Sequence, residues 1–276
     1  MVRAEGITRI QGMDLSDCTV FVTGANRGIG RAIAQALARE PLAALLCGVR
    51  DPDRFEPLAA PIAAAEVRAV RIDLSSRASV EDSVAGLGDD LRRIDVLVNN
   101  AGQMTGGLLE EQDMEQVYAM FQVNLVAVAH LTARVLPGMV ERRRGLVVNN
   151  ASISGYAAFP AASTYAAAKA GVVALSEALR RELKPAGVHV MHLVTPGVRT
   201  EMLAATEEVY GRHMDTSGWT SVEPQDWAAK VVQAMRDDRH IVGPGGVLAL
   251  AKLASRGPAG LLDAITARSF SRSPRR

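Results

Sequence analysis

The amino-acid sequence places an apolar strand directly before a glycine-rich turn and a helix. Strand candidate 19–23 is followed by Gly24-Ala25-Asn26-Arg27-Gly28-Ile29-Gly30. Helical periodicity then continues over residues 29–39. Glycines permit a tight turn, while the free N–H groups and positive dipole end of a helix attract a phosphate. This order predicts a dinucleotide site, and a purely structural turn is the alternative.

Strand and helix signals alternate along the rest of the chain. Further strand candidates are residues 44–49, 67–72, 96–98, 146–148, 188–194 and 240–242. Further helix candidates are residues 79–92, 114–141, 165–183 and 224–237. The strands are apolar on both faces, which favours a doubly wound, Rossmann-like α/β fold with a parallel sheet between helices. We expect one domain over residues 1–245, an irregular or short-helical lid at 200–222, and an extension at 246–276.

The end of the second strand candidate indicates which dinucleotide the turn accepts. A protein that selects NAD usually places a carboxylate there, for the adenosine ribose hydroxyls. Here Val49 takes that position and Arg50 follows it. Arg27 and Arg50 are predicted to bind the 2′-phosphate of NADP(H) by charge-assisted hydrogen bonds, and two solvated surface arginines are the alternative.

Four residues carry the predicted chemistry. Tyr165 and Lys169 stand four positions apart on an alanine-rich helix, so both project from one face. A nearby ammonium favours the phenolate and is expected to lower the pKa of Tyr165, and it can also bind the nicotinamide ribose. Ser152, after the fifth strand, can donate to a developing alkoxide, with Ser154 as the competing assignment. Asn124 is a polar residue inside a long apolar helix, where a buried structural asparagine is the alternative.

The ordered set of motifs resembles the short-chain dehydrogenase/reductase family in its single-domain, NADP-preferring branch. The resemblance covers about residues 15–242. It depends on Thr23-Gly24 with Gly28-Ile29-Gly30, Asp73, Asn99-Asn100-Ala101-Gly102, Asn124, Ser152, Tyr165 with Lys169, and Pro196-Gly197. It implies an oxidoreductase that transfers a hydride between NADP(H) and a carbonyl or secondary alcohol of an apolar substrate. Tyr165 would be the general acid/base, and Asn124 would hold a water that links Lys169 to solvent.

The turn and the resemblance together imply the cofactor contacts. Asp73 would contact adenine, the loop after the fourth strand would wall the cofactor, and Val198 and Thr200 would close over the carboxamide. The predicted cofactor-binding residues are Gly24, Asn26, Arg27, Gly28, Ile29, Gly30, Arg50, Asp73, Leu74, Asn100, Ala101, Gly102, Tyr165, Lys169, Pro196, Gly197, Val198 and Thr200.

Composition limits the partners. The formal net charge is +1, so no strong field attracts nucleic acid. Cys18 and Cys47 are predicted to be reduced thiols that pack as small apolar side chains. Reduced thiols are typical of a cytoplasmic protein. No apolar stretch approaches the length of about 20 residues that is needed to span a bilayer. No pattern of histidines, carboxylates or thiolates suggests a metal site.

The extension leaves the assembly state open. Residues 247–253 and 261–265 are apolar and lie among arginines. They are expected to pack against the protein or a second subunit of a homo-oligomer, a dimer or tetramer, with peripheral membrane contact as the alternative. Two other functions also stay open, a catalytically inactive NADP(H)-sensing or regulatory protein and a structural subunit.

Overall fold

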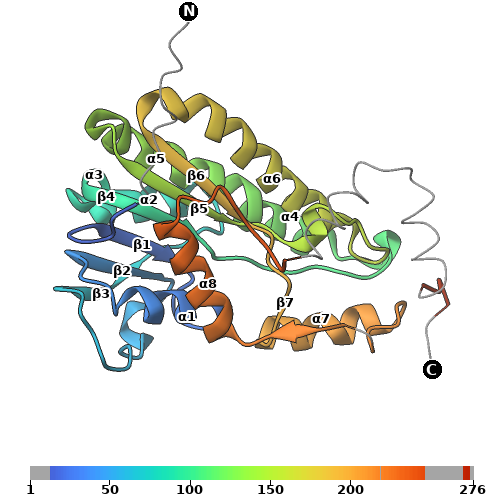
Figure 1. The fold of residues 1–276 in the computed structure, drawn as a ribbon. Coiled ribbons are helices and arrows are strands. Elements are labelled where there is room, and N and C mark those ends of the chain that lie inside the picture. Colours follow the sequence, from blue (N-terminus) through green and yellow to red (C-terminus); the bar gives the residue numbers. More distant parts are fainter. Residues whose placement is uncertain (1–12, 218, 246–269, 274–276) are drawn as a thin grey trace, which may run out of the picture.

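The computed structural model describes residues 13–217, 219–245 and 270–273, which form a parallel sheet between two layers of helices (Figure 1). The seven strands lie in the order β3 (Val67–Arg71), β2 (Ala44–Val49), β1 (Thr19–Thr23), β4 (Ile94–Asn99), β5 (Gly145–Asn150), β6 (Val188–Leu193), β9 (Ile241–Val242). This confirms the predicted doubly wound, Rossmann-like fold. The order reverses between β1 and β4, where ligands bind outside the carboxyl ends of the strands in such sheets.

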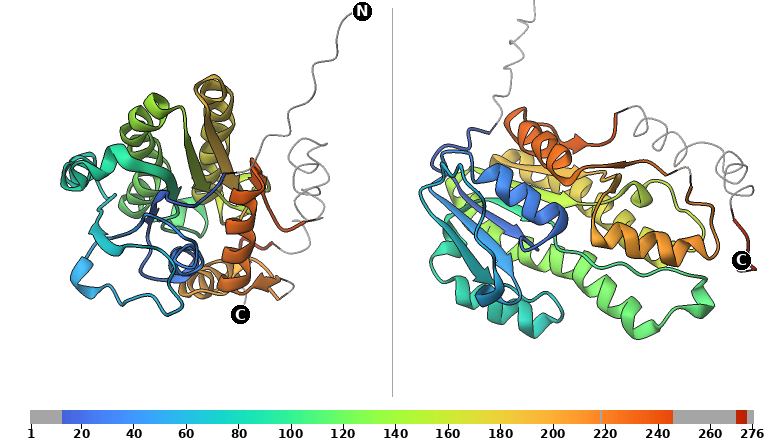
Figure 2. Two further views of the ribbon diagram at one scale, coloured as in Figure 1. Left: turned by 60° about the vertical axis from the view of Figure 1, so that its left-hand side comes forward. Right: turned by 90° about the horizontal axis from the view of Figure 1, so that it is seen from below.

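Both faces of the sheet are buried because each strand sends apolar side chains in both directions. Helices α1 (Gly28–Leu37) and α8 (Pro224–Arg236) cover one face, and α2 (Arg77–Leu87), α5 (Ala127–Arg142) and α6 (Ser163–Leu183) cover the other (Figure 2). Val20 and Val22 face the first layer, while Phe21 between them faces the second. This alternation places apolar residues at the three central positions of β1, as expected for a central parallel strand.

Two predicted helices are interrupted. The helix expected at 79–92 ends before Gly88, which has φ 54°, and α3 (Asp90–Arg93) follows. The helix expected at 114–141 consists of α4 (Met114–Phe121), the π turn η3 (Gln122–Val126) and α5. A π turn inserts one residue into the helical repeat and is frequent at functional sites.

The segment expected to be irregular or short-helical contains a regular helix, α7 (Glu201–Gly211). It lies between the short strands β7 (Gly197–Val198) and β8 (Ser221–Val222), which pair in parallel. Thr200 caps α7 by accepting a hydrogen bond from Leu203 N at 3.3 Å. The remaining elements are the short helices η1 (Pro52–Arg54), η2 (Leu109–Glu111), η4 (Ile153–Gly155) and η5 (Lys184–Ala186).

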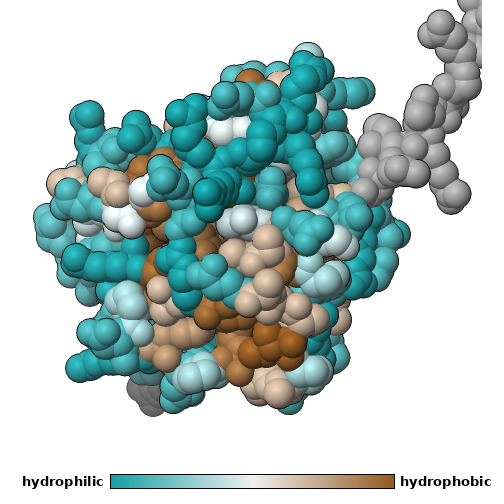
Figure 3. All heavy atoms as spheres, turned by 90° about the vertical axis from the view of Figure 1, so that its left-hand side faces the viewer, coloured by the Kyte–Doolittle hydropathy of each residue, from teal (hydrophilic) through white to brown (hydrophobic). Residues whose placement is uncertain are grey.

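Apolar character is not confined to the core. Within the described residues, the helical run Met114–Arg142 is long and apolar enough to cross a membrane, which corrects the expectation that no apolar stretch approaches that length. Half of its most apolar window is buried in the protein. The side of the molecule away from α7 shows a hydrophobic band among hydrophilic residues (Figure 3). A core helix meets the same length criterion, and neither feature by itself identifies a membrane-binding surface.

The end of the chain contacts the segment that follows α7. Residues 246–269 and 274–276, which hold both apolar runs of the extension, lie outside the described residues. Phe270 forms an isolated antiparallel bridge with Met214. Ser271 N donates to His213 O at 2.8 Å, and Nδ1 of the buried His213 lies 3.0 Å from Ser271 O. Phe270 and Ser271 are therefore tied to the segment that follows α7.

Truncation after Gly246 is expected to lower Tm by several degrees in the absence of lipid. It removes the hydrogen bonds at His213 and uncovers Met214, which should lower the free energy of unfolding by about 1–2 kcal/mol. In a chain of this length, each kcal/mol lost lowers Tm by about 2–4 °C. Calorimetry measures the shift, and a chain ending at Ser273 is the control. An unchanged Tm and assembly state with lost binding to anionic vesicles would instead favour membrane contact.

Candidate active site

The glycine-rich turn leaves backbone donors free at the start of α1. Gly24 and Gly28 have φ 69° and 54°, a region that favours glycine. A Cβ on Gly30 would lie 2.1 Å from Gly24 O, so only glycine permits this packing. Arg27, the N-cap of α1, makes no capping hydrogen bond, whereas α2, α4 and α7 are each capped by a side chain. The uncapped N–H groups fit the pyrophosphate of a dinucleotide.

The two predicted phosphate-binding arginines are both at the surface. Arg27 forms an ion pair with Glu201 at the start of α7, N to O distance 3.0 Å. Both side chains are largely exposed, and exposed pairs of this kind contribute only about 0–1 kcal/mol. Arg50 is exposed and makes no hydrogen bond or ion pair with any residue that the structure describes. A bound phosphate can therefore recruit both arginines at small cost.

The loop after β4 is fixed to the neighbouring strands. Thr23 Oγ1 accepts hydrogen bonds from the backbone N of Asn100 and Ala101, each at 3.0 Å, and Asn100 Nδ2 donates to Thr23 O at 3.0 Å. Asn150 Nδ2 donates to Asn100 Oδ1 at 3.0 Å. These bonds join β1, β4 and β5 at their carboxyl ends, where the sequence predicted a wall of the cofactor site.

Asp73 and Leu74 follow β3 on the adenine side of the predicted site. Asp73 N donates to Ser83 Oγ at 2.9 Å, and Asp73 Oδ1 accepts from Ser75 N at 3.0 Å. Leu74 is buried. The hydrogen bond from Ser75 N thus holds the carboxylate, while the bond to Ser83 holds the backbone of Asp73.

Ser152, Tyr165 and Lys169 lie together beyond the carboxyl ends of the strands. Ser152 is buried and hydrogen-bonds the Tyr165 side chain. Lys169 Nζ lies 5.7 Å from the centroid of the Tyr165 ring and donates to Asn150 O at 2.7 Å. The competing Ser154 instead donates its backbone N–H to Ser152 Oγ at 3.1 Å. The described contacts therefore join Ser152 to Tyr165.

Burial shifts the pKa of both catalytic candidates. Desolvation raises the pKa of Tyr165 to about 12, although the hydrogen bond with Ser152 acts in the opposite direction. Desolvation also lowers the pKa of Lys169 to about 8. The sequence prediction of a lowered Tyr165 pKa thus does not hold for the cofactor-free protein, because burial outweighs the charge of Lys169.

Asn124 lies in the π turn and is almost fully buried. Its Nδ2 donates to Gln103 O and its Oδ1 accepts from Gln103 N, both at 2.8 Å. A Cβ on Gly102 would lie 3.3 Å from Asn124 Oδ1 and 3.9 Å from Lys169 Nζ. The amide side chain is satisfied by the backbone of the loop after β4, as in the structural alternative. A water relay through Asn124 remains a prediction.

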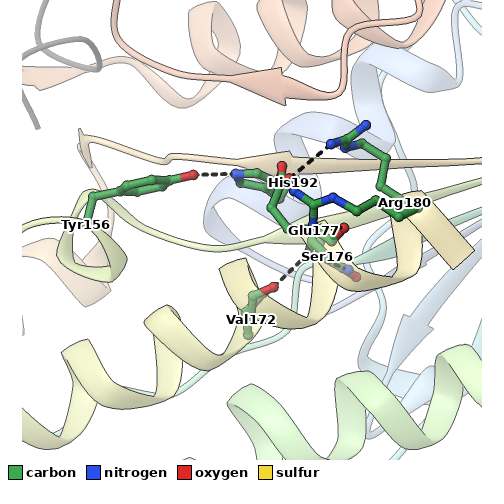
Figure 4. A network of polar contacts seen from close by, with 8 residues as sticks. Tyr156, Val172, Ser176, Glu177, Arg180 and His192 are labelled. Carbon is green, nitrogen blue, oxygen red and sulfur yellow. Dashed lines mark hydrogen bonds and ion pairs between the residues drawn. The ribbon is translucent and has the colours of Figure 1, made fainter. Parts of the chain in front are cut away.

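A buried polar network that the sequence analysis missed supports the Ser152 loop (Figure 4). Tyr156 Oη lies 2.8 Å from Nε2 of His192 on β6. His192 Nδ1 is 4.0 Å from Glu177 Oε1, and Glu177 pairs with Arg180 at 3.1 Å. The only sequence signal was a histidine within an apolar strand. The network ties the loop after Ser152 to β6 and α6.

The segment after β6 approaches the nucleotide turn. Val198 is buried in β7, and Gly197 packs close to Thr220 O. Thr200 Oγ1 donates to Val198 O at 3.2 Å, and the Thr200 methyl lies 3.3 Å from where a Cβ on Gly28 would be. Thr200 therefore lies beside the turn, and its hydroxyl caps α7. A contact of Thr200 with the carboxamide stays a prediction.

The described residues hold no group of three or more His, Cys, Asp or Glu side chains that is arranged to bind a metal. Cys18 and Cys47 are free and buried, and burial raises their thiol pKa values to about 11 and about 12. Their pKa values identify both as packed, unreactive thiols.

The sheet order, the uncapped glycine-rich helix and the tyrosine–lysine–serine set together define a dinucleotide-dependent oxidoreductase. The profile of the short chain dehydrogenase family matches residues 18–210, and the chain belongs to that family. It is 30% identical over 227 residues to an uncharacterized oxidoreductase of Staphylococcus aureus, which covers 82% of this chain and 94% of the relative. It is 31% identical to the glycine betaine reductase of Emericella nidulans, covering 87% of this chain and only 19% of that protein.

Solved structures support the same assignment. One of them is a short-chain dehydrogenase from Sphingobium yanoikuyae in complex with NADPH, which is 27% identical in sequence to this chain. The match covers 89% of this chain and 95% of the Sphingobium chain, with a TM-score of 0.71. A putative NAD(P)-dependent gluconate 5-dehydrogenase from Beutenbergia cavernae with bound NADP is 29% identical, covers 86% and 98%, and has a TM-score of 0.71.

Proposed function

We propose that this oxidoreductase uses NADP(H) to interconvert a carbonyl and a secondary alcohol of an apolar substrate, with Tyr165 as the general acid/base. The observation that carries the proposal is the contact between the half-buried Tyr165 and the buried Ser152, one helical turn from Lys169. The NADP- and NADPH-bound relatives support the choice of cofactor. Apolar Met104 and Phe159, which pack beside the first turn of α6, support an apolar substrate.

The residues of the chain supply binding, polarisation and the proton. When bound, the nicotinamide supplies or accepts the hydride. In reduction, Ser152 donates a hydrogen bond to the substrate oxygen and Tyr165 Oη transfers its proton to that oxygen. A Tyr165 pKa of about 12 keeps the phenol protonated at neutral pH, as a general acid requires. Lys169, with a pKa of about 8, binds the ribose and replaces the lost proton.

The function is tested by NADPH consumption with a panel of apolar ketones, aldehydes and quinones. Consumption that depends on the carbonyl compound is expected. A protein that binds NADPH but consumes none with any member of the panel would be the inactive sensing or regulatory protein instead.

A homo-oligomer in the cytoplasm stays a prediction.

NADPH is expected to exceed NADH at least ten- to a hundredfold in kcat/KM. Charge-assisted hydrogen bonds from Arg27 and Arg50 to the 2′-phosphate contribute about 1.5–3 kcal/mol each, reduced by solvent screening. Arg50→Ala should lower this ratio about tenfold. Arg39→Ala, an exposed arginine just beyond the opposite end of α1, is the control. Equal use of both cofactors by the unmodified protein would contradict the assignment.

A further inference from the structure

Tyr210 carries a buried hydroxyl that has no hydrogen-bond partner among the described residues. The residue lies near the end of α7 and is 3% exposed. Within the part of the chain that the structure describes, its Oη makes no hydrogen bond. A buried polar group without a partner costs folding free energy, and phenylalanine would fill the same space without that cost.

The ring of Tyr210 is packed into a specific place. It contacts Ala161 and Ala162 at the start of α6, with Met104 and Phe159 alongside. Ala162 comes three positions before Tyr165 on the chain. The ring therefore covers the end of α6 that carries the proposed acid.

Gly106 provides the room for this ring. A Cβ there would lie 2.4 Å from Tyr210 Cε1, closer than any real contact. On its other side, the ring meets Trp219 edge-on, with centroids 5.9 Å apart. The position of the ring is thus determined by the loop after β4 and by the segment after α7.

Tyr210 packs next to the start of the helix that carries Tyr165, because its neighbour Ala162 directly precedes that helix. Burial raises the pKa of Tyr210, and the charge of a Tyr165 phenolate acts in the same direction. In the proposed reaction, Ser152 and Tyr165 already donate to the two lone pairs of the reacting oxygen. The Tyr210 hydroxyl is then left to bind a different polar atom.

We propose that Tyr210 is a substrate-binding residue whose hydroxyl bonds a second oxygen of the substrate, beyond the reacting carbonyl. The orphaned hydroxyl, its apolar surroundings and its place over the start of α6 carry the inference, which rests on the proposed function. The preferred substrates are then apolar ketones or aldehydes with a further carbonyl or hydroxyl group. A site built to bind such a group discriminates against the analogue that lacks it.

Paired substrates test this inference. The first pair is 1-phenylpropane-1,2-dione and propiophenone, followed by the other diketone and ketone pairs of the panel. Tyr210→Phe is expected to lower the preference for the diketone, measured as the ratio of kcat/KM values, about tenfold and mainly through KM. The diketone and the ketone differ in intrinsic reactivity, but this difference cancels when the ratio for Tyr210→Phe is compared with the ratio for the unmodified protein.

Thermal stability provides a second readout. Tyr210→Phe should leave Tm unchanged or raise it, because the hydroxyl that it removes has no protein partner among the described residues. Tyr118→Phe is the matched control, since that side chain on α4 is 66% exposed, and it should change neither the ratio nor Tm.

An unchanged preference, or a fall in Tm of several degrees, would overturn the inference and leave the proposed function intact. If the unmodified protein consumed NADPH with no carbonyl compound in the panel, the proposed function itself would fail and the inference with it.

Discussion

Replacing Tyr165 with phenylalanine is expected to lower kcat at least a hundredfold, about 2.7 kcal/mol in the activation barrier. The dissociation constant of NADPH should change by less than about threefold. The ring keeps its packing in α6, while the proton that completes reduction and the hydrogen bond with Ser152 are lost. Initial rates and a fluorescence titration of NADPH measure the two effects separately.

Tyr118→Phe removes an exposed hydroxyl and serves as the control for this experiment also. If Tyr165→Phe retained more than about a tenth of kcat, Tyr165 could not be the general acid. A parallel loss of NADPH binding would place the tyrosine in cofactor binding rather than in chemistry.

Lys169→Met is expected to abolish turnover and yet raise the free energy of unfolding by about 2 kcal/mol at pH 7, without cofactor. Burial lowers the pKa of Lys169 from 10.5 to about 8, so below pH 8 the folded protein bears the full cost of the buried ammonium, about 3 kcal/mol. The lost hydrogen bond to Asn150 O offsets about 1 kcal/mol.

The stability gained by Lys169→Met should depend on pH, because it comes from removing a buried ammonium whose pKa is lowered. Between pH 8 and 10.5 the unfolded chain binds more protons at Lys169 than the folded chain, so the stability of the unmodified protein rises with pH and the advantage of Lys169→Met shrinks. Urea denaturation at pH 7, 8, 9 and 10 measures it. These values stay at or below pH 10, because the raised pKa of Tyr165 destabilises the folded protein between about pH 10 and 12.

Lys230→Met is the control for that series. The Lys230 side chain also donates to a backbone carbonyl, Gly243 O at 2.7 Å, but it is exposed, and its loss should change stability little. The opposite result would be a Lys169→Met protein that is less stable than the unmodified protein at pH 7, by an amount that does not change with pH. It would show that burying the Lys169 ammonium costs no folding free energy.

The strands could be predicted because their central positions send apolar side chains to both faces of the sheet. The start of β1 at Thr19 and its end at Thr23 agree with the prediction, since the glycine-rich turn ends the strand locally. The break at Gly88 was missed although it has a local cause, since a glycine with positive φ commonly ends a helix. The π turn at Asn124 left no such local signal in the sequence. The regular helix α7 was missed since its apolar face is defined by contacts such as Tyr210 on Ala162.

The proposed site was predictable where its residues are close in sequence. The spacing of Tyr165 and Lys169 placed both on one face of α6. The acceptor of Lys169, Asn150 O, and the partner of Tyr156, His192, come from other strands and left no local signal. The direction of the Tyr165 pKa shift was wrong because charge can be read from the sequence, whereas burial of this side chain depends on the fold around it.

Hydride transfer is tested most directly with NADPH that carries two deuterium atoms on C4 of the nicotinamide, so that the transferred hydride is labelled whichever face it leaves. Incubation with the carbonyl panel, followed by mass spectrometry of the products, locates the label. Direct transfer to a carbonyl carbon requires one deuterium on the carbinol carbon of the alcohol for each NADPH oxidised. The Tyr165→Phe reaction should give at least a hundredfold less labelled alcohol over the same period. Oxidation of NADPH without deuterated alcohol, or no oxidation with any carbonyl compound, would contradict the proposed reaction.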